Sequence, residues 1–426
     1  MFLRNLYKLL LSIFLLIAFS NHEIKARELS IKDLELRKKL DQERLLERKK
    51  RGLKKSNIEI KFSTEVIFLS KERKIPPVLS NLDPILNDEG FYGIKLANED
   101  NLTTGNFLGH DYKFKFIQVA LGEDLVQEFI KLIESGSQYF IVDLRTDEIL
   151  ELTKLEQFKE IIMFNTRSRS DKLRNEFCHK NLFHVSPSNS ILSDALTQYL
   201  VKKNWKKWFL VVGPEEQDKE FAKSIKKSAK KFNIKIKEER VWDFTSDLRR
   251  TSQKEVPIFT KGVNYDVLIV SDIKGEFGEY LVYRTWDPRP VAGTQGLVPT
   301  SWHRTHEQWG ATQMQNRFRR DAGRWMTPVD YNAWVGLRSL GEAVTRLGTN
   351  DLNEVKNFIV SKKFGIGAYK GVKVSYRSWN NQLRQPVLLA SPRSMISVSP
   401  QEGYLHPFSE LDTLGPDEPE STCKFK

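Results

Sequence analysis

Short apolar segments that alternate with helical segments constrain this chain more than any other feature. Residues 139–143 (YFIVD) and 267–270 (VLIV) are almost entirely apolar, which is typical of strands buried on both faces of a parallel sheet. Between such segments, residues 123–135 carry apolar side chains at helical spacing. Strands joined by helices of this length form right-handed βαβ units. The sequence therefore predicts an α/β fold built on parallel sheets.

The alternation runs in two series, which meet at residues 183–188. After the second series, a Gly-rich extended stretch over 291–299 leads into two helical segments, over 305–323 and 328–347. A crossing followed by two helices is what a chain needs to return to its first lobe. We therefore predict two Rossmann-like lobes with three hinge crossings, near residues 185, 295 and 365, and a central cleft.

The predicted organisation divides the 426 residues into five parts. The length suffices for two α/β domains with well-filled cores. The segments 369–376 and 385–390 are expected to pair as strands, and the Pro-, Gly- and acid-rich end as irregular chain docked on the body. The boundaries are a signal peptide over 1–26, a charged helical arm over 27–56, lobe one over 57–186 and 298–362, lobe two over 187–297 and 363–392, and a C-terminal tail over 393–426.

The first 26 residues have the pattern of a secretory signal. Arg4 and Lys8 precede an apolar core over 9–19, and Ile24-Lys25-Ala26 offers a cleavage site. The alternative is an uncleaved anchor, but the apolar segment is short for a bilayer span. Without a cysteine at the cleavage point, the lipid anchor of a lipoprotein is not expected. The mature protein is thus expected to be soluble after export.

The chain contains two cysteines, Cys178 and Cys423. In an exported protein, two cysteines most simply form one disulfide, which would tie the tail to the first lobe. Two unpaired thiols are the alternative.

The formal net charge of +13 does not indicate nucleic-acid binding, because basic residues are concentrated in the signal and the arm. Beyond residue 55 no Lys/Arg segment is interleaved with aromatics as in a single-strand-binding groove. The arm has acid–base pairs at helical i, i+4 spacing, as in Glu35/Lys39, which favours a solvated helix. Docking of the arm to a partner or to an anionic membrane is the alternative.

The loops that follow the strands carry the candidate ligand-binding residues. In parallel α/β sheets, small ligands bind at the carboxyl ends of the strands, where such loops converge. For each residue the alternative role is capping of a helix or turn, as Thr146 could do. The candidates are Asp143, Arg145, Thr146, Asn165, Thr166 and Arg167 in the first lobe, and Glu215, Asp272 and the aromatic Trp286 in the second.

Enzymatic and metal chemistry find little support in the sequence. The chain contains neither a GxSxG elbow nor an HExxH motif. His303, His306 and Glu307 have the spacing of zinc ligands on one helix face, but no further His or Cys lies nearby. We expect a hydrogen-bonding role for these histidines, no cofactor and no catalytic site.

Several segments resemble a known family. They are SNLDP (80–84), DNLTTGNFLG (100–109), TWDPRPVAGTQGL (285–297), QLRQPVLLA (382–390) and SPQEGYLHPFSELDTLGPDEPESTC (399–423). Together with the layout, they look like the type I periplasmic substrate-binding proteins of leucine/branched-chain amino-acid ABC transporters. More narrowly, they resemble the subgroup associated with pyrroloquinoline-quinone (PQQ)-dependent alcohol dehydrogenase systems.

The resemblance implies a periplasmic binding protein-like I fold that closes on a small solute and delivers it to an ABC transporter permease in the inner membrane. A ligand sensor or accessory factor for a periplasmic quinoprotein is the alternative. Amino-acid binders of this kind use small hydroxyl residues after first-lobe strands and an acid in the second lobe. Here the first-lobe loops carry Asp143, Arg145, Asn165 and Arg167, which favours a different polar or anionic solute. Asp272 lies near the position of the expected acid.

Overall fold

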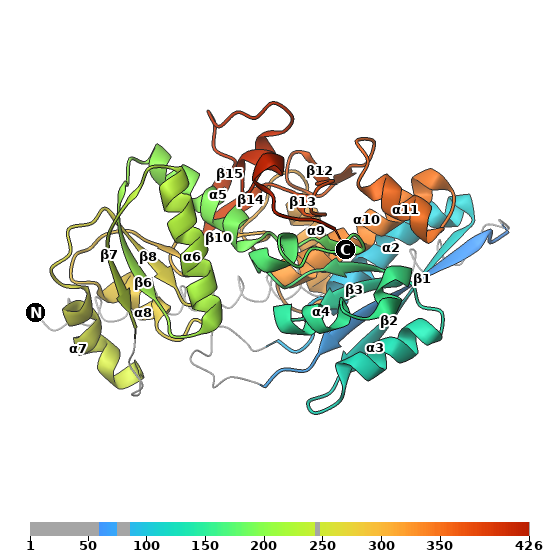
Figure 1. Cartoon of the computed structure of the whole chain (residues 1–426), viewed down its shortest axis with the longest axis horizontal. Helices are drawn as coiled ribbons and strands as arrows, with labels where there is room; N and C mark the ends of the chain where they lie inside the picture. The colour runs from blue at the N-terminus through green and yellow to red at the C-terminus, as the bar shows by residue number, and fades with distance from the viewer. Residues whose placement is uncertain (1–58, 75–85, 243–247, 426) are drawn as a thin grey trace, which may run out of the picture. The chain divides into compact units, whose positions relative to one another are not determined.

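The computed structural model describes residues 59–74, 86–242 and 248–425, and from Ile60 onward they belong to one compact unit. The predicted signal peptide and arm, residues 1–26 and 27–56, lie outside the described residues. Within the unit, two parallel sheets form the centres of two lobes (Figure 1).

The first sheet has five strands, all parallel, in the order β2-β1-β3-β4-β5. Every residue of β3 and β4 is buried, as their apolar sequences predict. Alternate residues face opposite sides, so Ile141 packs in one core cluster and Phe140 in another. The strands are β1 (Phe62–Lys71), β2 (His110–Val119), β3 (Tyr139–Asp143), β4 (Ile162–Asn165) and β5 (Leu182–His184).

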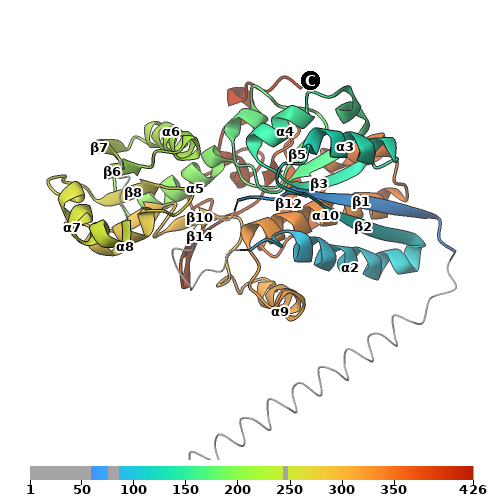
Figure 2. The same cartoon turned by 90° about the horizontal axis from the view of Figure 1, so that it is seen from below.

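Helices cover both faces of this sheet (Figure 2). One face carries α2 (Phe91–Leu108) and α10 (Pro328–Leu347), and the other carries α3 (Leu125–Glu134) and α4 (Thr146–Leu152). Helix α10 begins at the predicted residue because Thr327 caps it and Pro328 occupies its first turn. Also in this lobe are α9 (Ala311–Ala322), α11 (Leu352–Ile359), and the 3-10 helices η1 (Glu156–Glu160) and η2 (Asp171–Arg174).

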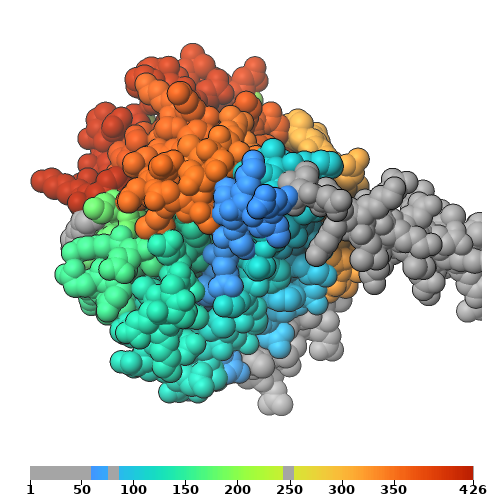
Figure 3. Space-filling view, turned by 90° about the vertical axis from the view of Figure 1, so that its right-hand side faces the viewer, coloured from blue at the N-terminus to red at the C-terminus, as the bar shows by residue number. Residues whose placement is uncertain are grey.

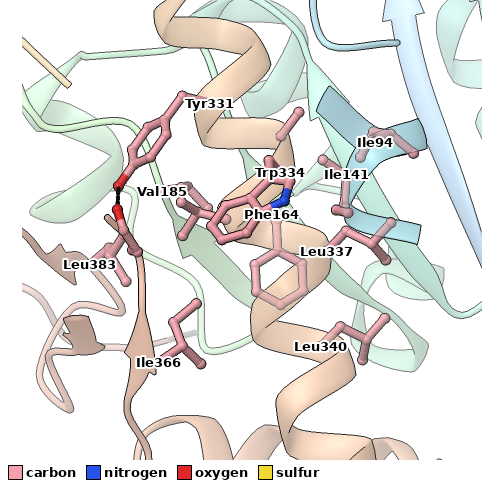
Figure 4. Close-up of a cluster of buried hydrophobic side chains, with 14 of the residues drawn as sticks. Ile94, Ile141, Phe164, Val185, Tyr331, Trp334, Leu337, Leu340, Ile366 and Leu383 are labelled. Atoms are coloured by element: carbon pink, nitrogen blue, oxygen red, sulfur yellow. Dashed lines mark hydrogen bonds between the residues drawn. The ribbon is translucent and has the colours of Figure 1, made fainter. Parts of the chain in front are cut away.

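Helix α10 fills the larger core of the first lobe. Its side chains Trp334 and Leu337 lie beside Phe164 of β4, in the same core cluster as Ile94 of α2 (Figure 4). The return of the chain predicted from the sequence therefore brings α10 onto the first sheet. In Figure 3, the orange residues of α10 and α11 lie directly beside the blue and teal residues of the first half of the chain.

The second sheet has four parallel strands in the order β7-β6-β8-β9. Its edge strand β7 alternates exposed charged with half-buried residues, a pattern that discourages pairing with another chain. The strands are β6 (Lys207–Val212), β7 (Lys235–Val241), β8 (Val267–Ser271) and β9 (Val291–Gly293). The helices are α5 (Asn189–Lys202), α6 (Glu216–Lys231), α7 (Leu248–Thr260) and α8 (Gly278–Arg284).

The chain passes three times between the two cores. Val185 belongs to the first core and Ile191 to the second, Ala292 to the second and Trp302 to the first, and Leu383 to the first and Val387 to the second. The third passage thus follows Leu383 and not residue 363, because residues 366–383 pack their apolar side chains against the first lobe.

Hydrogen bonds join the passages to one another. Gln385 Nε2 donates to Val185 O at 2.7 Å, and His184 N donates to Asn381 O at 2.9 Å. The buried Lys370 Nζ donates to Gln385 Oε1 at 2.6 Å and to Pro386 O at 2.8 Å. The first and third passages therefore form one hydrogen-bonded hinge.

The expected pairing of segments 369–376 and 385–390 is wrong. Instead, β12 pairs with β11 and β13, while β14 pairs with β10 and β15. The choice of partner depends on which lobe each strand packs against, which local sequence does not encode. The strands are β10 (Val298–Thr300), β11 (Ile366–Gly367), β12 (Lys373–Tyr376), β13 (Leu383–Arg384), β14 (Val387–Ser391) and β15 (Ser394–Ser399).

The tail is docked on the body by one disulfide and by buried polar contacts. Cys178 and Cys423 form the disulfide, which joins residues 245 positions apart. Gly415 N donates to the buried Asp194 Oδ2 at 2.9 Å, and Lys231 pairs with the same carboxylate at 2.8 Å. Beyond β15 the regular structure consists of two short 3-10 helices, η3 (Glu410–Thr413) and η4 (Glu418–Glu420).

Candidate functional site

The carboxyl ends of the first-lobe strands gather a network of charged side chains. Asp143 is the last residue of β3, and its carboxylate pairs with Arg167, from the loop after β4, and with Arg73, which follows β1. Arg73 Nη2 lies 3.0 Å from Asp143 Oδ1, and Arg167 Nη2 lies 2.5 Å from Glu89 Oε2. We call these four residues the first-lobe charge network.

The network favours the charged forms of Asp143 and Arg167. Burial alone would raise the pKa of Asp143, but the adjacent Arg167 and Arg73 outweigh it and hold that pKa below its usual value. Arg167 remains a cation because the negative charges of Asp143 and Glu89 compensate its burial. Arg167 is therefore already paired with two carboxylates of the protein, those of Asp143 and Glu89.

The other first-lobe candidates shape the loops. Asn165 Nδ2 donates to Ser168 O at 2.8 Å, and its Oδ1 accepts from Ser168 N at 2.8 Å. Thr166 Oγ1 donates to Val142 O at 2.8 Å, and Thr146 Oγ1 lies 2.8 Å from Ser168 Oγ. These contacts bring the loops after β3 and β4 together.

Arg145 and Arg169 differ from the arginines of the network. Arg145 is exposed at the N-cap position of α4. Arg169 is half-buried in the loop after β4, two residues beyond Arg167. Its guanidinium makes no hydrogen bond or ion pair within residues 59–74, 86–242 and 248–425.

The second-lobe candidates Glu215 and Asp272 lie at the carboxyl edge of their own sheet. The Asp272 carboxylate accepts hydrogen bonds from the backbone N–H groups of Gly275, Phe277 and Gly278 at 2.8–3.0 Å. Glu215 is exposed and pairs with Lys274 at 2.8 Å. Asp218 links the two loops, since its carboxylate accepts from Glu215 N at 3.2 Å and from Ile273 N at 2.7 Å.

Trp286 lies away from this group. It follows α8, which returns the chain to the amino end of the sheet, just before β9 begins. Its backbone N–H donates to Thr260 Oγ1 at 2.8 Å, and Lys261 Nζ lies 4.4 Å from the centre of its ring. Proximity in sequence to a crossing did not place the side chain at the strand ends.

Three residues of the first-lobe edge were missed by the sequence analysis: Arg73, Glu89 and Arg169. Arg73 and Glu89 flank the long connection after β1, and only the fold brings them to Asp143. For Arg169 a signal existed, because the loop after β4 reads TRSRS and presents two arginines two residues apart. The first of these was selected and the second was not.

We expect a pH dependence from Asp218. Burial raises the pKa of Asp218 to about 6, with a further contribution from the neighbouring Asp272. An aspartate in an unfolded chain has a pKa of about 3.9. The folded state therefore binds this proton more tightly, so its stabilising contribution is present below about pH 4 and is lost as the pH rises through about 6. Replacement by the uncharged asparagine, Asp218→Asn, should remove this loss.

Urea unfolding of both proteins between pH 4 and 7 checks this expectation. The difference in free energy of unfolding, Asp218→Asn minus wild type, should increase with pH. The loss of a backbone hydrogen bond can lower the stability of the variant, but it does so equally at every pH and leaves this trend unchanged. A difference that stays constant from pH 4 to 7 would contradict the assignment.

The histidines considered as zinc ligands serve the local structure. His303 Nδ1 lies 2.7 Å from Thr305 Oγ1, and His306 Nε2 lies 2.7 Å from Tyr369 O. Within the described part of the chain, no cluster of three or more His, Cys, Asp or Glu side chains could hold a metal ion. Likewise, none of the described helices combines the length and apolar character needed to cross a bilayer.

Comparison with known proteins gives matches at the level of structure only. No family model matches the chain, and no curated protein matches its sequence. A leucine-, isoleucine-, valine-, threonine- and alanine-binding protein from Brucella ovis, in a closed conformation, superposes with a TM-score of 0.65 at 13% identity, over 85% of this chain and 99% of that one. A branched-chain amino-acid ABC transporter periplasmic ligand-binding protein from Burkholderia xenovorans superposes with a TM-score of 0.64 at 13% identity. The match covers 79% of this chain and 95% of that one.

A third similar structure is an ABC-transporter solute-binding protein from R. palustris in complex with benzoate. It superposes with a TM-score of 0.59 at 12% identity, over 85% of this chain and 100% of that one. The chain has the type I periplasmic-binding-protein fold. This confirms the predicted α/β class with its parallel-sheet lobes.

Proposed function

We propose that the chain is the periplasmic solute-binding component of an ABC-type importer and that it is not an enzyme. It would bind a small polar solute between its two lobes by hinge closure and present the closed form to a permease in the inner membrane. The observation that carries the proposal is the triple passage of the chain between two parallel-sheet lobes, each with a polar carboxyl edge.

The three passages supply a suitable hinge. Short segments that connect two separately packed cores can change their backbone angles while each core stays intact. Here the cores are distinct clusters, and the first and third passages are hydrogen-bonded to each other. Closure would then move the lobes as two bodies.

Direct contacts between the lobes also support the proposal. Helix α6 of the second lobe reaches η2 of the first, where Ser224 Oγ donates to Asp171 Oδ2 at 2.9 Å. Beside it, Lys172 Nζ lies 2.8 Å from Glu220 Oε1. Half-exposed polar contacts of this kind are weak, so a ligand that binds both lobes can shift the balance between open and closed forms.

The structural neighbours are described as binding branched-chain amino acids in some cases and benzoate in another. They support the solute-binding class without naming the solute of this chain. The association with a PQQ-dependent alcohol dehydrogenase system stays a prediction from the resemblance. The test therefore includes quinone cofactors and short alcohols.

A thermal-shift screen of amino acids, organic acids, short alcohols and quinone cofactors tests the function. A ligand at 100 times its Kd stabilises the folded state by about 2.7 kcal/mol, which raises the Tm by several degrees. For closure, spectroscopic labels on Asp147→Cys in α4 and Lys219→Cys in α6, both exposed positions, should approach each other when the hit is added. The proposal is wrong if no solute raises the Tm, or if a hit leaves the distance between the labels unchanged.

A further inference from the structure

Among the residues that the structure describes, the half-buried guanidinium of Arg169 has no hydrogen-bond or ion-pair partner. Three other arginines of the first lobe are satisfied by the protein. Arg73 and Arg167 pair with Asp143. The buried Arg174 donates to Gln382 Oε1 and to two backbone carbonyls at 2.8–2.9 Å. Arg169 has no such contact within the described residues.

Within the described part of the chain, the two carboxylates of the first-lobe charge network are already engaged by other arginines. Glu89 acts on Arg169 electrostatically, but its carboxylate is held by Arg167 at 2.5 Å. Asp143 is shared by Arg73 and Arg167. Burial and the repulsion of Arg167 together lower the pKa of Arg169. The surroundings thus leave a net positive charge at this point of the edge.

The backbone holds Arg169 at the junction of the two lobes. Its carbonyl oxygen accepts from Asn189 N, the first residue of α5, at 2.8 Å. The loop therefore connects the carboxyl edge of β4 with the first passage. A ligand bound by this side chain would lie where both lobes can reach it.

Two serine hydroxyls near the strand ends are also unsatisfied. Ser170, next to Arg169, and Ser70, at the end of β1 opposite Asp143, are buried, and their Oγ atoms have no hydrogen-bond partner among the described residues. Buried polar atoms without protein partners are uncommon, and contact with a water or an ion is one physical reason for them.

We propose that Arg169 binds the carboxylate group of the solute, so that the ligand is a small organic acid. A guanidinium offers two parallel N–H donors that match the two oxygens of a carboxylate, and the bound anion would neutralise the unpaired charge. This inference rests on the proposed solute-binding function and adds the chemical class of the ligand.

Isothermal titration with matched ligands tests the proposal. The panel pairs aliphatic and aromatic carboxylic acids with their own primary amides and alcohols, and includes inorganic phosphate. Wild type should bind an acid and not its amide. Arg169→Gln should weaken the binding of that acid about 10- to 150-fold, the value of hydrogen bonds to a charged group. Arg169→Lys keeps the positive charge but loses the two parallel N–H donors of the guanidinium. Its affinity for the acid should lie between those of wild type and Arg169→Gln.

The control is Arg393→Gln, an exposed arginine in the turn between β14 and β15, which should bind the acid as wild type does. Without ligand, Arg169→Gln should unfold at the same temperature as wild type or higher, because it loses an unpaired buried charge. Failure of this variant to fold would contradict the proposal.

Other outcomes separate the two proposals. Equal binding by Arg169→Gln and wild type, binding of amides or alcohols in preference to acids, or binding of phosphate alone would overturn the carboxylate assignment and leave solute binding standing. Absence of binding by wild type to every solute of this panel and of the thermal-shift screen would overturn the proposed function itself.

Discussion

Asp412→Ala is expected to lower the free energy of unfolding by about 3–5 kcal/mol, because it leaves two arginines without their shared carboxylate. Asp412 lies in η3 of the tail and accepts from Arg377 Nε at 2.9 Å and from Arg384 Nε at 2.8 Å. The side chains of Arg377 and Asp412 are each only 1% exposed. Removal of the carboxylate therefore leaves buried positive charge without a compensating negative charge.

The remaining contacts of Arg377 cannot replace the carboxylate. Its two Nη atoms donate to the carbonyls of Leu411, Leu414 and Pro416 in the same tail. Neutral carbonyls satisfy the donors but do not compensate the charge. Burial already lowers the pKa of Arg377, and Asp412 is the first of the interactions that oppose this.

Chemical denaturation with the disulfide intact measures this effect. The control is Asp417→Asn in the same tail, which breaks the more exposed pair with His406 at 3.0 Å and removes only the smallest of the electrostatic contributions to Arg377. That pair should contribute less than about 1 kcal/mol. Similar losses in the two variants would show that the buried cluster does not hold the tail.

Gly93→Ala is expected to destabilise the protein by about 2–3 kcal/mol through overpacking. Gly93 lies in the first turn of α2, where the backbone of α10 approaches most closely. A Cβ atom at this position would lie 2.0 Å from Asp330 O, which belongs to the backbone and cannot rotate away. The two helices would have to separate, although alanine favours a helix by about 1 kcal/mol over glycine.

The matched control is Gly336→Ala in the middle of α10. There a Cβ atom would meet Phe164 Cβ at 3.4 Å and Val185 Cγ2 at 3.6 Å, which are ordinary contact distances. The helix propensity of alanine should then leave this variant as stable as wild type or slightly more so. Urea unfolding of both variants gives the comparison, and equal stabilities would contradict the close approach of α2 and α10.

Separation of these helices should also affect the candidate site. Glu89 and Gly90 precede α2, and Gly90 N donates to Asp330 Oδ1 at 2.7 Å. Displacement of α2 would shift Glu89, the partner of Arg167 in the first-lobe charge network. The position of the charges at the strand ends thus depends on a contact between helices far apart in sequence.

Local signals sufficed where a residue acts on its own neighbours. Helix α10 was predicted over 328–347 and is observed at Pro328–Leu347, because Thr327 caps its start and Gly348 adopts the left-handed conformation at its end. Helix α9 was predicted to begin near residue 305 and begins at Ala311, since Gly310 has a positive φ that interrupts the helix.

Long-range packing overrode local preference elsewhere. Helix α2 continues to Leu108 through Thr103, Thr104 and Gly105, which are poor helix formers. The helix survives there because it packs along α10, where Asn101 Nδ2 donates to Leu337 O at 3.1 Å. No window of sequence around residue 100 contains this information.

The sequence alone determined the α/β class, the two lobes and the return of α10 to the first sheet, because apolar periodicity and helix caps act over a few residues. Only the tertiary structure decided which charges meet. It engaged Arg167 and Asp272 with groups of their own lobes and placed Trp286 at the opposite edge of its sheet. Among the described residues, it left the Arg169 guanidinium without a hydrogen-bond or ion-pair partner. Residues distant in sequence determine whether a charged side chain is paired within the fold or remains available to a ligand. Composition and spacing do not contain that information.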